Sequence, residues 1–145
     1  GLQITYVKPH GALYNDMMAD RAVRTAVMRS VAGYHRPLDL MLQATPQAES
    51  HREEAREFGL TLLFEAFADR CYADDGHLRS RRLPDAVHTR ERMLDQVRQI
   101  LEHRSVTTHG GKSLVLAIDS LCVHGDNPEG VNAIQEIRQL IAGGA

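Results

Sequence analysis

A chain of 145 residues can form one domain with a buried core, and 43% hydrophobic and 25% charged residues are ordinary for a globular protein. The formal net charge of −2 gives no electrostatic reason to expect binding to nucleic acid or to an anionic membrane. No apolar run approaches the length of a membrane span, and Cys71 and Cys122 lie too far apart for a C-x-x-C pair. We therefore expect a cytoplasmic protein with free thiols.

The first half of the chain predicts alternating strands and helices. The expected elements are a strand at Leu2–Val7, a helix at Ala19–Val31, a strand at Leu38–Leu42, a helix at Ala48–Phe58 and a strand at Leu60–Phe67. The third of these strands is almost entirely apolar, which is typical of a parallel strand buried on both faces.

The second half continues this alternation after a long polar segment without periodicity, 69–87. A helix is predicted at Arg90–His103, strand segments at Ser113–Ile118 and Leu121–Val123, and a closing helix at Val131–Ala142. Strands that alternate with helices along the whole chain indicate an α/β fold with a parallel sheet.

Polar residues follow the first predicted strand directly. Pro9 and Gly11 stop the strand and set a tight turn, which gathers Lys8, His10 and Asn15 where the strand gives way to a helix. Ligand-binding groups of α/β folds sit at the carboxyl ends of parallel strands. A cation, an imidazole and an amide at such an edge suit an oxygen-rich substrate.

Two other strand ends carry similar groups. Glu65 lies within the third strand, Asp69 and Arg70 follow it, and His124 and Asp126 follow the last strand. In a β/α barrel, these ends converge on one mouth, so scattered polar residues would form one site.

Each of these groups also has a purely structural interpretation. Glu65 could be a buried acid paired with Arg70 or Lys8, and Asp69 could form a local ion pair with Arg70. The segment 124–126 could serve only as a turn and helix cap. Tyr14 and Tyr72 could pack rather than bind substrate.

Three ordered blocks resemble the LamB/YcsF family, the A component of bacterial ATP-dependent 5-oxoprolinase. The first is the V-K-P-H-G-A-L-Y-N run at 7–15. The second is E-A-F-A-D-R-C-Y at 65–72, followed by Asp75-Gly76 and by Arg81 with Pro84. The third is D-S-L-C-V-H-G-D-N-P at 119–128. The chain departs from the family pattern at Asp85, where a glycine is usual, and at His88, where an apolar residue is usual.

The resemblance implies a deformed TIM-like β/α barrel of the glycoside hydrolase/deacetylase type. A complete barrel takes about 250 residues, and the acidic and histidine-rich blocks that precede the K-P-H-G segment in the family do not occur here. We therefore expect residues 1–145 to be a single domain that forms the C-terminal portion of such a barrel, with the N-terminal portion absent. A possible homo-oligomer or an obligate partner would then cover the open sheet.

The resemblance further implies opening of 5-oxo-L-proline, a lactam, to L-glutamate with hydrolysis of ATP (with Mg²⁺), in company with 5-oxoprolinase B and C subunits. Such a reaction needs cations for the anionic groups, a base for water and an acid for the departing nitrogen. Lys8 and Arg70 are our candidates for binding a carboxylate or phosphate, and His10 or His124 for the acid and base.

The remaining candidates support these groups. The carboxylates that could orient them or hold magnesium are Glu65, Asp69 and Asp126. The further side chains that could bind substrate are Asn15 and Tyr72. No H-x-x-x-H or H-x-H spacing occurs, so we assign no ligands of a dedicated zinc site. Neither a G-x-x-x-x-G-K-[ST] nor a G-x-G-x-x-G loop occurs, so we expect ATP to bind through another kind of site, through the absent N-terminal portion or with help from partner subunits. A metal-dependent amidohydrolase or deacetylase of the same barrel class, and a non-catalytic scaffold for partner subunits, stay open as alternatives.

Overall fold

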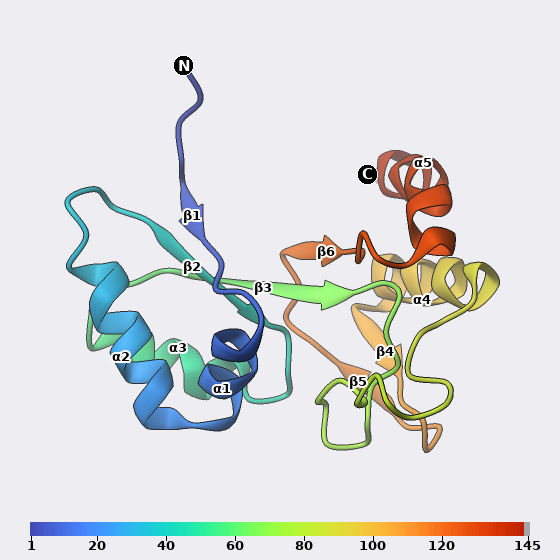
Figure 1. Cartoon of the computed structure of the whole chain (residues 1–145), viewed down its shortest axis with the longest axis horizontal. Helices are drawn as coiled ribbons and strands as arrows, with labels where there is room; N and C mark the ends of the chain where they lie inside the picture. The colour runs from blue at the N-terminus through green and yellow to red at the C-terminus, as the bar shows by residue number, and fades with distance from the viewer. Residues whose placement is uncertain (144–145) are drawn as a thin grey trace. The chain divides into compact units, whose positions relative to one another are not determined.

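A computed structural model describes residues 1–143 and resolves two compact units, Gly1–Glu65 and Ala66–Ala145. The boundary falls inside the third strand, β3 (Leu62–Phe67), so this strand contributes residues to both units. The strand order is β1-β2-β3-β6, and the first three strands pair in parallel (Figure 1). The predicted parallel α/β class is confirmed.

The first unit alternates short strands with helices. Tyr6 pairs with Asp39, and the β2–β3 register runs from Leu40 opposite Leu62 to Gln43 opposite Glu65. The elements of this unit are β1 (Tyr6–Val7), α1 (Ala12–Ala19), α2 (Arg21–Ala32), β2 (Asp39–Gln43), α3 (Ala48–Arg56) and the start of β3.

A layer of fully buried side chains joins these helices to the strands. Met17 comes from α1, Met28 from α2, Leu40 and Leu42 from β2, and Phe64 from β3. Each such side chain stabilises the folded state by about 1.5–3 kcal/mol relative to exposure. The apolar periodicity of the sequence therefore identified every element of this layer except α1.

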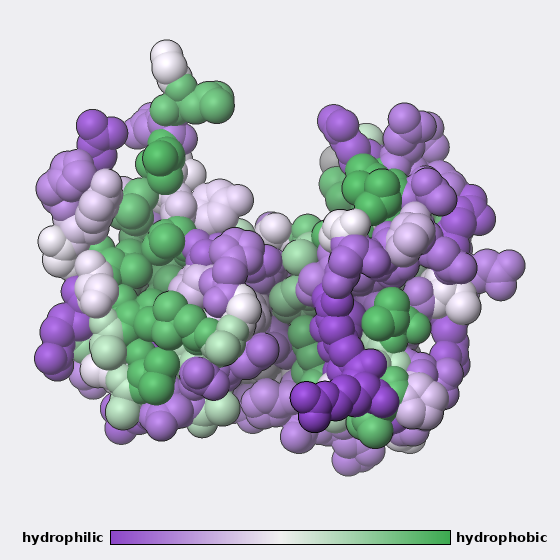
Figure 2. All heavy atoms as spheres, viewed as in Figure 1, coloured by the Kyte–Doolittle hydropathy of each residue, from purple (hydrophilic) through white to green (hydrophobic). Residues whose placement is uncertain are grey.

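Two features of the first unit differ from the prediction. The predicted strand at Leu2–Val7 is regular only at Tyr6–Val7, and Figure 2 shows apolar atoms exposed along the stretch that leads into it. The chain also forms a helix at Ala12–Ala19, where none was predicted. Asp20 separates this helix from α2, because its extended backbone breaks the helix and its carboxylate accepts hydrogen bonds from two α2 backbone N–H groups.

The second unit contains a parallel-sheet edge and a separate hairpin. At the end of β3, the Ala68 N–H donates to the Cys122 carbonyl over 2.9 Å. The hairpin pairs β4 with β5 in antiparallel orientation. The elements are α4 (Arg90–His103), β4 (Ser105–Thr107), β5 (Ser113–Val115), β6 (Ser120–Cys122) and α5 (Pro128–Gly143).

Helix α4 follows the predicted bounds, whereas the hairpin corrects the prediction around it. The strand at Ser105–Thr107 was not predicted, and the strand predicted at Ser113–Ile118 ends at Val115. Arg104 adopts a left-handed conformation with φ 52° directly after α4, which turns the chain at once into β4. Since Arg104 is neither glycine nor asparagine, its residue type does not indicate this turn.

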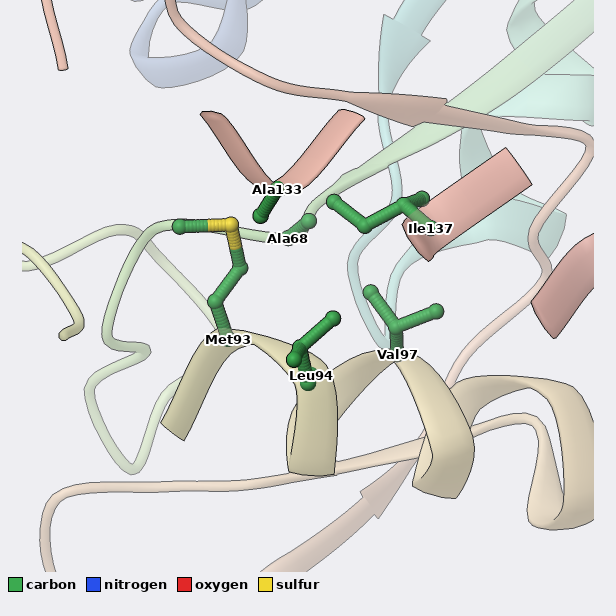
Figure 3. Packing of buried hydrophobic residues seen from close by; sticks show 6 residues of the cluster. All are labelled: Ala68, Met93, Leu94, Val97, Ala133 and Ile137. Carbon is green, nitrogen blue, oxygen red and sulfur yellow. The ribbon is translucent and has the colours of Figure 1, made fainter. Parts of the chain in front are cut away.

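Helices α4 and α5 enclose the core of the second unit. Figure 3 shows side chains of α4 pointing toward α5, and the buried cluster consists of Ala68, Met93, Leu94, Val97, Ala133 and Ile137. Met93 and Val97 lie four residues apart on α4 and are fully buried, as helical spacing requires. Among residues 1–143, no helix combines the length and the apolar character needed to cross a membrane.

Candidate functional site

The turn after β1 positions the first polar group. Gly11 has φ 61° and ψ −135°, a conformation almost closed to other residues, and it immediately precedes α1. This turn directs the chain from the strand into the helix, so Lys8 and Tyr14 come from opposite sides of one short connection. The K-P-H-G run thus sets the turn of the backbone and also supplies polar side chains.

Lys8, Tyr14 and Glu65 form a hydrogen-bonded group in the first unit. The Lys8 Nζ lies 2.7 Å from Oε2 of Glu65, and the Tyr14 hydroxyl donates to Oε1 over 2.8 Å. The Lys8 Nζ also lies 5.7 Å from the Tyr14 ring centroid. The Glu65 side chain is 2% exposed and the Lys8 side chain 21%. Both oxygens of the carboxylate are therefore engaged by protein donors, and of the two partners predicted for Glu65 the structure selects Lys8.

His10 and Asn15 do not belong to this group. Both are exposed, His10 in the turn and Asn15 on α1. Of the three residues gathered by the sequence around the first strand end, only Lys8 reaches the buried carboxylate.

Asp69 and His124 form a second group, in the second unit. The His124 Nδ1 lies 3.0 Å from Oδ1 and 3.1 Å from Oδ2 of Asp69, and the His124 backbone N–H donates to Oδ2 over 3.3 Å. The Phe67 ring stacks on the imidazole, with centroids 5.3 Å apart and planes at 16°. Asn127 completes the group through its amide, 3.5 Å from Oδ2.

The electrostatics of Asp69 fix the tautomer of the imidazole. Burial alone would raise the pKa of Asp69, but the hydrogen bonds and charge of His124 outweigh it, so the net pKa lies below the usual range. An ionised carboxylate can only accept, so Nδ1 carries the proton. Within residues 1–143 the hydrogen bonds of the imidazole all lie at Nδ1, and the His124 side chain is 24% exposed. An imidazole held in this way can exchange a proton at Nε2.

Arg70 and Tyr72 are engaged in holding the 69–87 segment. The Arg70 guanidinium donates to the carbonyls of Ala86 and Arg79, at 3.3 and 2.6 Å. The Tyr72 hydroxyl accepts the Phe67 backbone N–H over 2.9 Å, and its side chain is fully buried. Burial lowers the pKa of Arg70 below its usual value. Both residues thus shape the loop whose first residue is the Asp69 partner of His124.

Asp126 faces solvent and pairs with Arg81, although it lies only two residues beyond His124. The hydrogen bond from Arg81 lowers the pKa of Asp126 below its usual range. Asp126 is therefore ionised at neutral pH, and its partner is a motif arginine for which the sequence predicted no particular role.

Sequence reasoning missed Gln96 of α4 as a support of the second group. Its Nε2 donates to the carbonyls of Phe67, Ala68 and Arg70, at 2.8, 3.3 and 3.0 Å, and its Oε1 lies 3.2 Å from His88. The amide therefore satisfies the carbonyls at and just after the end of β3. A glutamine on the apolar face of a predicted helix was the available signal, because a buried amide needs partners.

The described residues do not form a metal centre by themselves. Among residues 1–143, no three histidine, cysteine, aspartate or glutamate side chains are arranged to hold a metal ion. Glu65 is saturated by Lys8 and Tyr14, and Asp69 by His124. Magnesium at the three predicted carboxylates stays a prediction.

Comparisons with known proteins point in one direction. Residues 1–144 match the LamB/YcsF family. The second 5-oxoprolinase A component of Pseudomonas putida is 46% identical over 144 residues, which are 99% of this chain and 56% of that protein. The 5-oxoprolinase A component of Vibrio campbellii is 48% identical over 143 residues, 97% of this chain and 56% of that protein.

Structural similarity agrees with the sequence matches. The crystal structure of a lactam utilization protein from Thermus thermophilus is similar with a TM-score of 0.81 and 30% identity, over 97% of this chain and 56% of that one. The chain thus spans about half the length of the relatives that it matches.

Proposed function

The chain belongs to the LamB/YcsF family, and on that premise we propose that it acts as the A component of an ATP-dependent 5-oxoprolinase. The proposed reaction opens 5-oxo-L-proline to L-glutamate together with B and C subunits. Relatives named as 5-oxoprolinase A components and as a lactam utilization protein support the substrate class.

The Asp69–His124 pair is the observation that carries this proposal. A lactam is a stable amide whose nitrogen leaves poorly, so its opening needs an acid at the nitrogen and a base at the attacking water. His124 can serve either purpose at Nε2, because Asp69 holds the proton at Nδ1 and fixes the orientation of the ring. Asp69 acts through His124 and is a positioning residue.

In this scheme ATP would supply a phosphoryl group to the lactam oxygen, with ADP as the leaving group and inorganic phosphate released once water has opened the ring. The sequence contains neither a G-x-x-x-x-G-K-[ST] nor a G-x-G-x-x-G loop, and in this proposal the nucleotide binds at another kind of site or with help from a partner subunit. Lys8 is the proposed cation of the first unit, and Glu65 and Tyr14 hold its ammonium in a fixed position. Its role is to neutralise an anionic group of a substrate.

The test is a coupled assay of the chain with B and C subunits, in which ADP and glutamate are measured together. His124→Asn should lower turnover at least about 100-fold, because general acid and base catalysis contributes about 10²–10⁴. Lys8→Ala should abolish the coupling without unfolding the protein. His103→Asn, at an exposed position at the end of α4, is the matched control and should leave turnover unchanged.

Three results would contradict the proposal. Full turnover by His124→Asn would remove His124 from the chemistry. Turnover without ATP that a chelator abolishes would indicate a metal-dependent amidohydrolase. Partner binding and turnover that depend on neither Lys8 nor His124 would indicate a scaffold.

A further inference from the structure

One motif residue has no part in the mechanism so far. Arg81 belongs to the R-x-x-P run of the 69–87 segment, at an exposed tip that covers residues 80–85. The base of this tip is fixed, since Arg70 donates to the carbonyls of Arg79 and Ala86 on either side of it. The Arg81 side chain is thus presented on an anchored loop.

The Arg81 guanidinium forms an ion pair with Asp126, 45 residues further along the chain. The two side chains are 42% and 65% exposed, so water competes for both partners and the pair contributes little to stability. Asp126 is close enough to His124 for the imidazole to help keep it ionised. The pair therefore lies at the border of the His124 group and can be exchanged at small cost.

Arg70 is not available for the same purpose. Its buried guanidinium donates to two carbonyls. Burial is the main cause that lowers the Arg70 pKa, and the positive charge of Arg81 lowers it further. The Arg79 carbonyl that Arg70 binds lies two residues before Arg81, so the two arginines belong to one loop, one structural and one exposed. An exposed arginine beside a second cation attracts an anion more strongly than an isolated one.

We propose that Arg81 is the anion-binding residue of the His124 site, and that it exchanges Asp126 for the carboxylate or phosphate of a substrate. This inference rests on the proposed function for the identity of the substrate. A guanidinium can hold either group through two parallel hydrogen bonds. In the absence of substrate, Asp126 keeps the side chain oriented. The anion-binding role predicted for Arg70 thereby moves to Arg81.

The Arg81–Asp126 ion pair could either exchange Asp126 for a substrate anion or only hold the loop in place. These two roles predict opposite results for Asp126→Asn. If Asp126 competes with the substrate for Arg81, Asp126→Asn frees the arginine and lowers the KM of the substrate. If the ion pair only holds the loop, removal of either partner has the same damaging effect. The sign of the Asp126→Asn effect therefore separates the two roles.

The experiment measures KM for 5-oxoproline and for ATP with the chain and its B and C subunits. Arg81→Gln should raise one of the two KM values at least about tenfold, the size of a lost hydrogen bond to a charged group, and Asp126→Asn should lower that same KM. A rise for 5-oxoproline identifies the carboxylate, and a rise for ATP identifies the phosphate. Arg82→Gln, at the exposed neighbouring arginine, is the matched control. Equal increases in Arg81→Gln and Asp126→Asn, or no change in either KM, would overturn the inference.

A binding measurement that needs no turnover separates this inference from the proposed function. The chain alone is titrated with 5-oxoproline and with inorganic phosphate, and the arginine Nε–H signals are followed by NMR. A shift of the Arg81 signal that is stronger in Asp126→Asn supports the inference even if no glutamate forms, in which case only the proposed function falls. If glutamate forms but neither anion shifts the Arg81 signal, the inference falls and the function stands.

Discussion

Glu65 and Asp69 are two buried carboxylates only four residues apart in sequence, yet they are used in opposite ways. Glu65, in the first unit, is held by the ammonium of Lys8 and the hydroxyl of Tyr14, so both of its oxygens are occupied. Asp69, in the second unit, is held by the imidazole of His124, whose far nitrogen is left for other partners. In the first group the carboxylate fixes an ammonium and a hydroxyl in place, whereas in the second it leaves a ring nitrogen able to exchange a proton.

The nature of the partner explains this difference. Lysine carries a point charge that a buried carboxylate neutralises, and a group of this kind serves equally well to position or to stabilise. Histidine has two nitrogens, so a carboxylate at one of them leaves the other able to take or give a proton. A buried acid in a predicted strand therefore becomes informative only when its partner is known.

The contrast between Glu65 and Asp69 is tested most strongly by neutralising each carboxylate in turn. Glu65→Gln should lower the free energy of unfolding by about 3 kcal/mol, since it removes the carboxylate charge that faces Lys8 in a largely buried place. Asp69→Asn should lower it by only about 1 kcal/mol, because the imidazole can become neutral. Urea denaturation followed by circular dichroism measures both.

The effect of these two substitutions on turnover should not follow their effect on the free energy of unfolding. Asp69→Asn removes the group that fixes the His124 tautomer, so the proposed turnover should fall far more than stability does. A Glu65→Gln variant as stable as the parent chain would show that Lys8 needs no buried counter-ion, and the contrast between the two groups would be lost.

The two turns that supply these groups offer a second comparison, with a smaller effect. Gly11→Ala should cost about 2 kcal/mol, because φ 61° with ψ −135° strains any residue with a Cβ. Gly125, in the turn after His124, has no such backbone conformation, and an added Cβ meets nothing within 4 Å. Gly125→Ala should therefore be nearly neutral in the same denaturation experiment. Equal costs for the two variants would contradict the strain assigned to Gly11.

Much of the fold followed from the sequence because apolar spacing reports burial directly. The helix at Arg90–His103 was predicted with its observed bounds, and Thr89 caps its start by accepting from the Arg92 N–H. The elements that were missed depend on single residues of unusual conformation or on a cap inside an apolar stretch. Asp20 ends a helix that was not predicted and caps the predicted one that follows, and Arg104 opens an antiparallel hairpin.

The site was less predictable, because hydrogen-bond partners depend on tertiary contacts. Strand ends located Glu65 and Asp69, but the choice of Lys8 over Arg70 as the partner of Glu65 depends on the register and on Gly11. Arg70 carries a motif position and yet serves carbonyls of its own loop. The convergence of all strand ends on one barrel mouth, and the place of residues 1–145 as the C-terminal part of a barrel domain, stay predictions.

The smallest expected effect is the pH dependence that Asp69 gives to stability. Its pKa is lower in the folded chain than the value of about 3.9 in an unfolded one. The stability that Asp69 contributes is therefore fully present above that value and is lost as the pH falls through the folded pKa. The difference in unfolding free energy between the parent chain and Asp69→Asn should be constant near neutral pH and should shrink as the pH falls below about 4. In a His124→Asn background this shrinkage should be weaker, because the hydrogen bonds and charge of His124 depress the Asp69 pKa. A difference that stays the same across the acid range, with His124 intact, would mean that Asp69 is held by groups other than the imidazole.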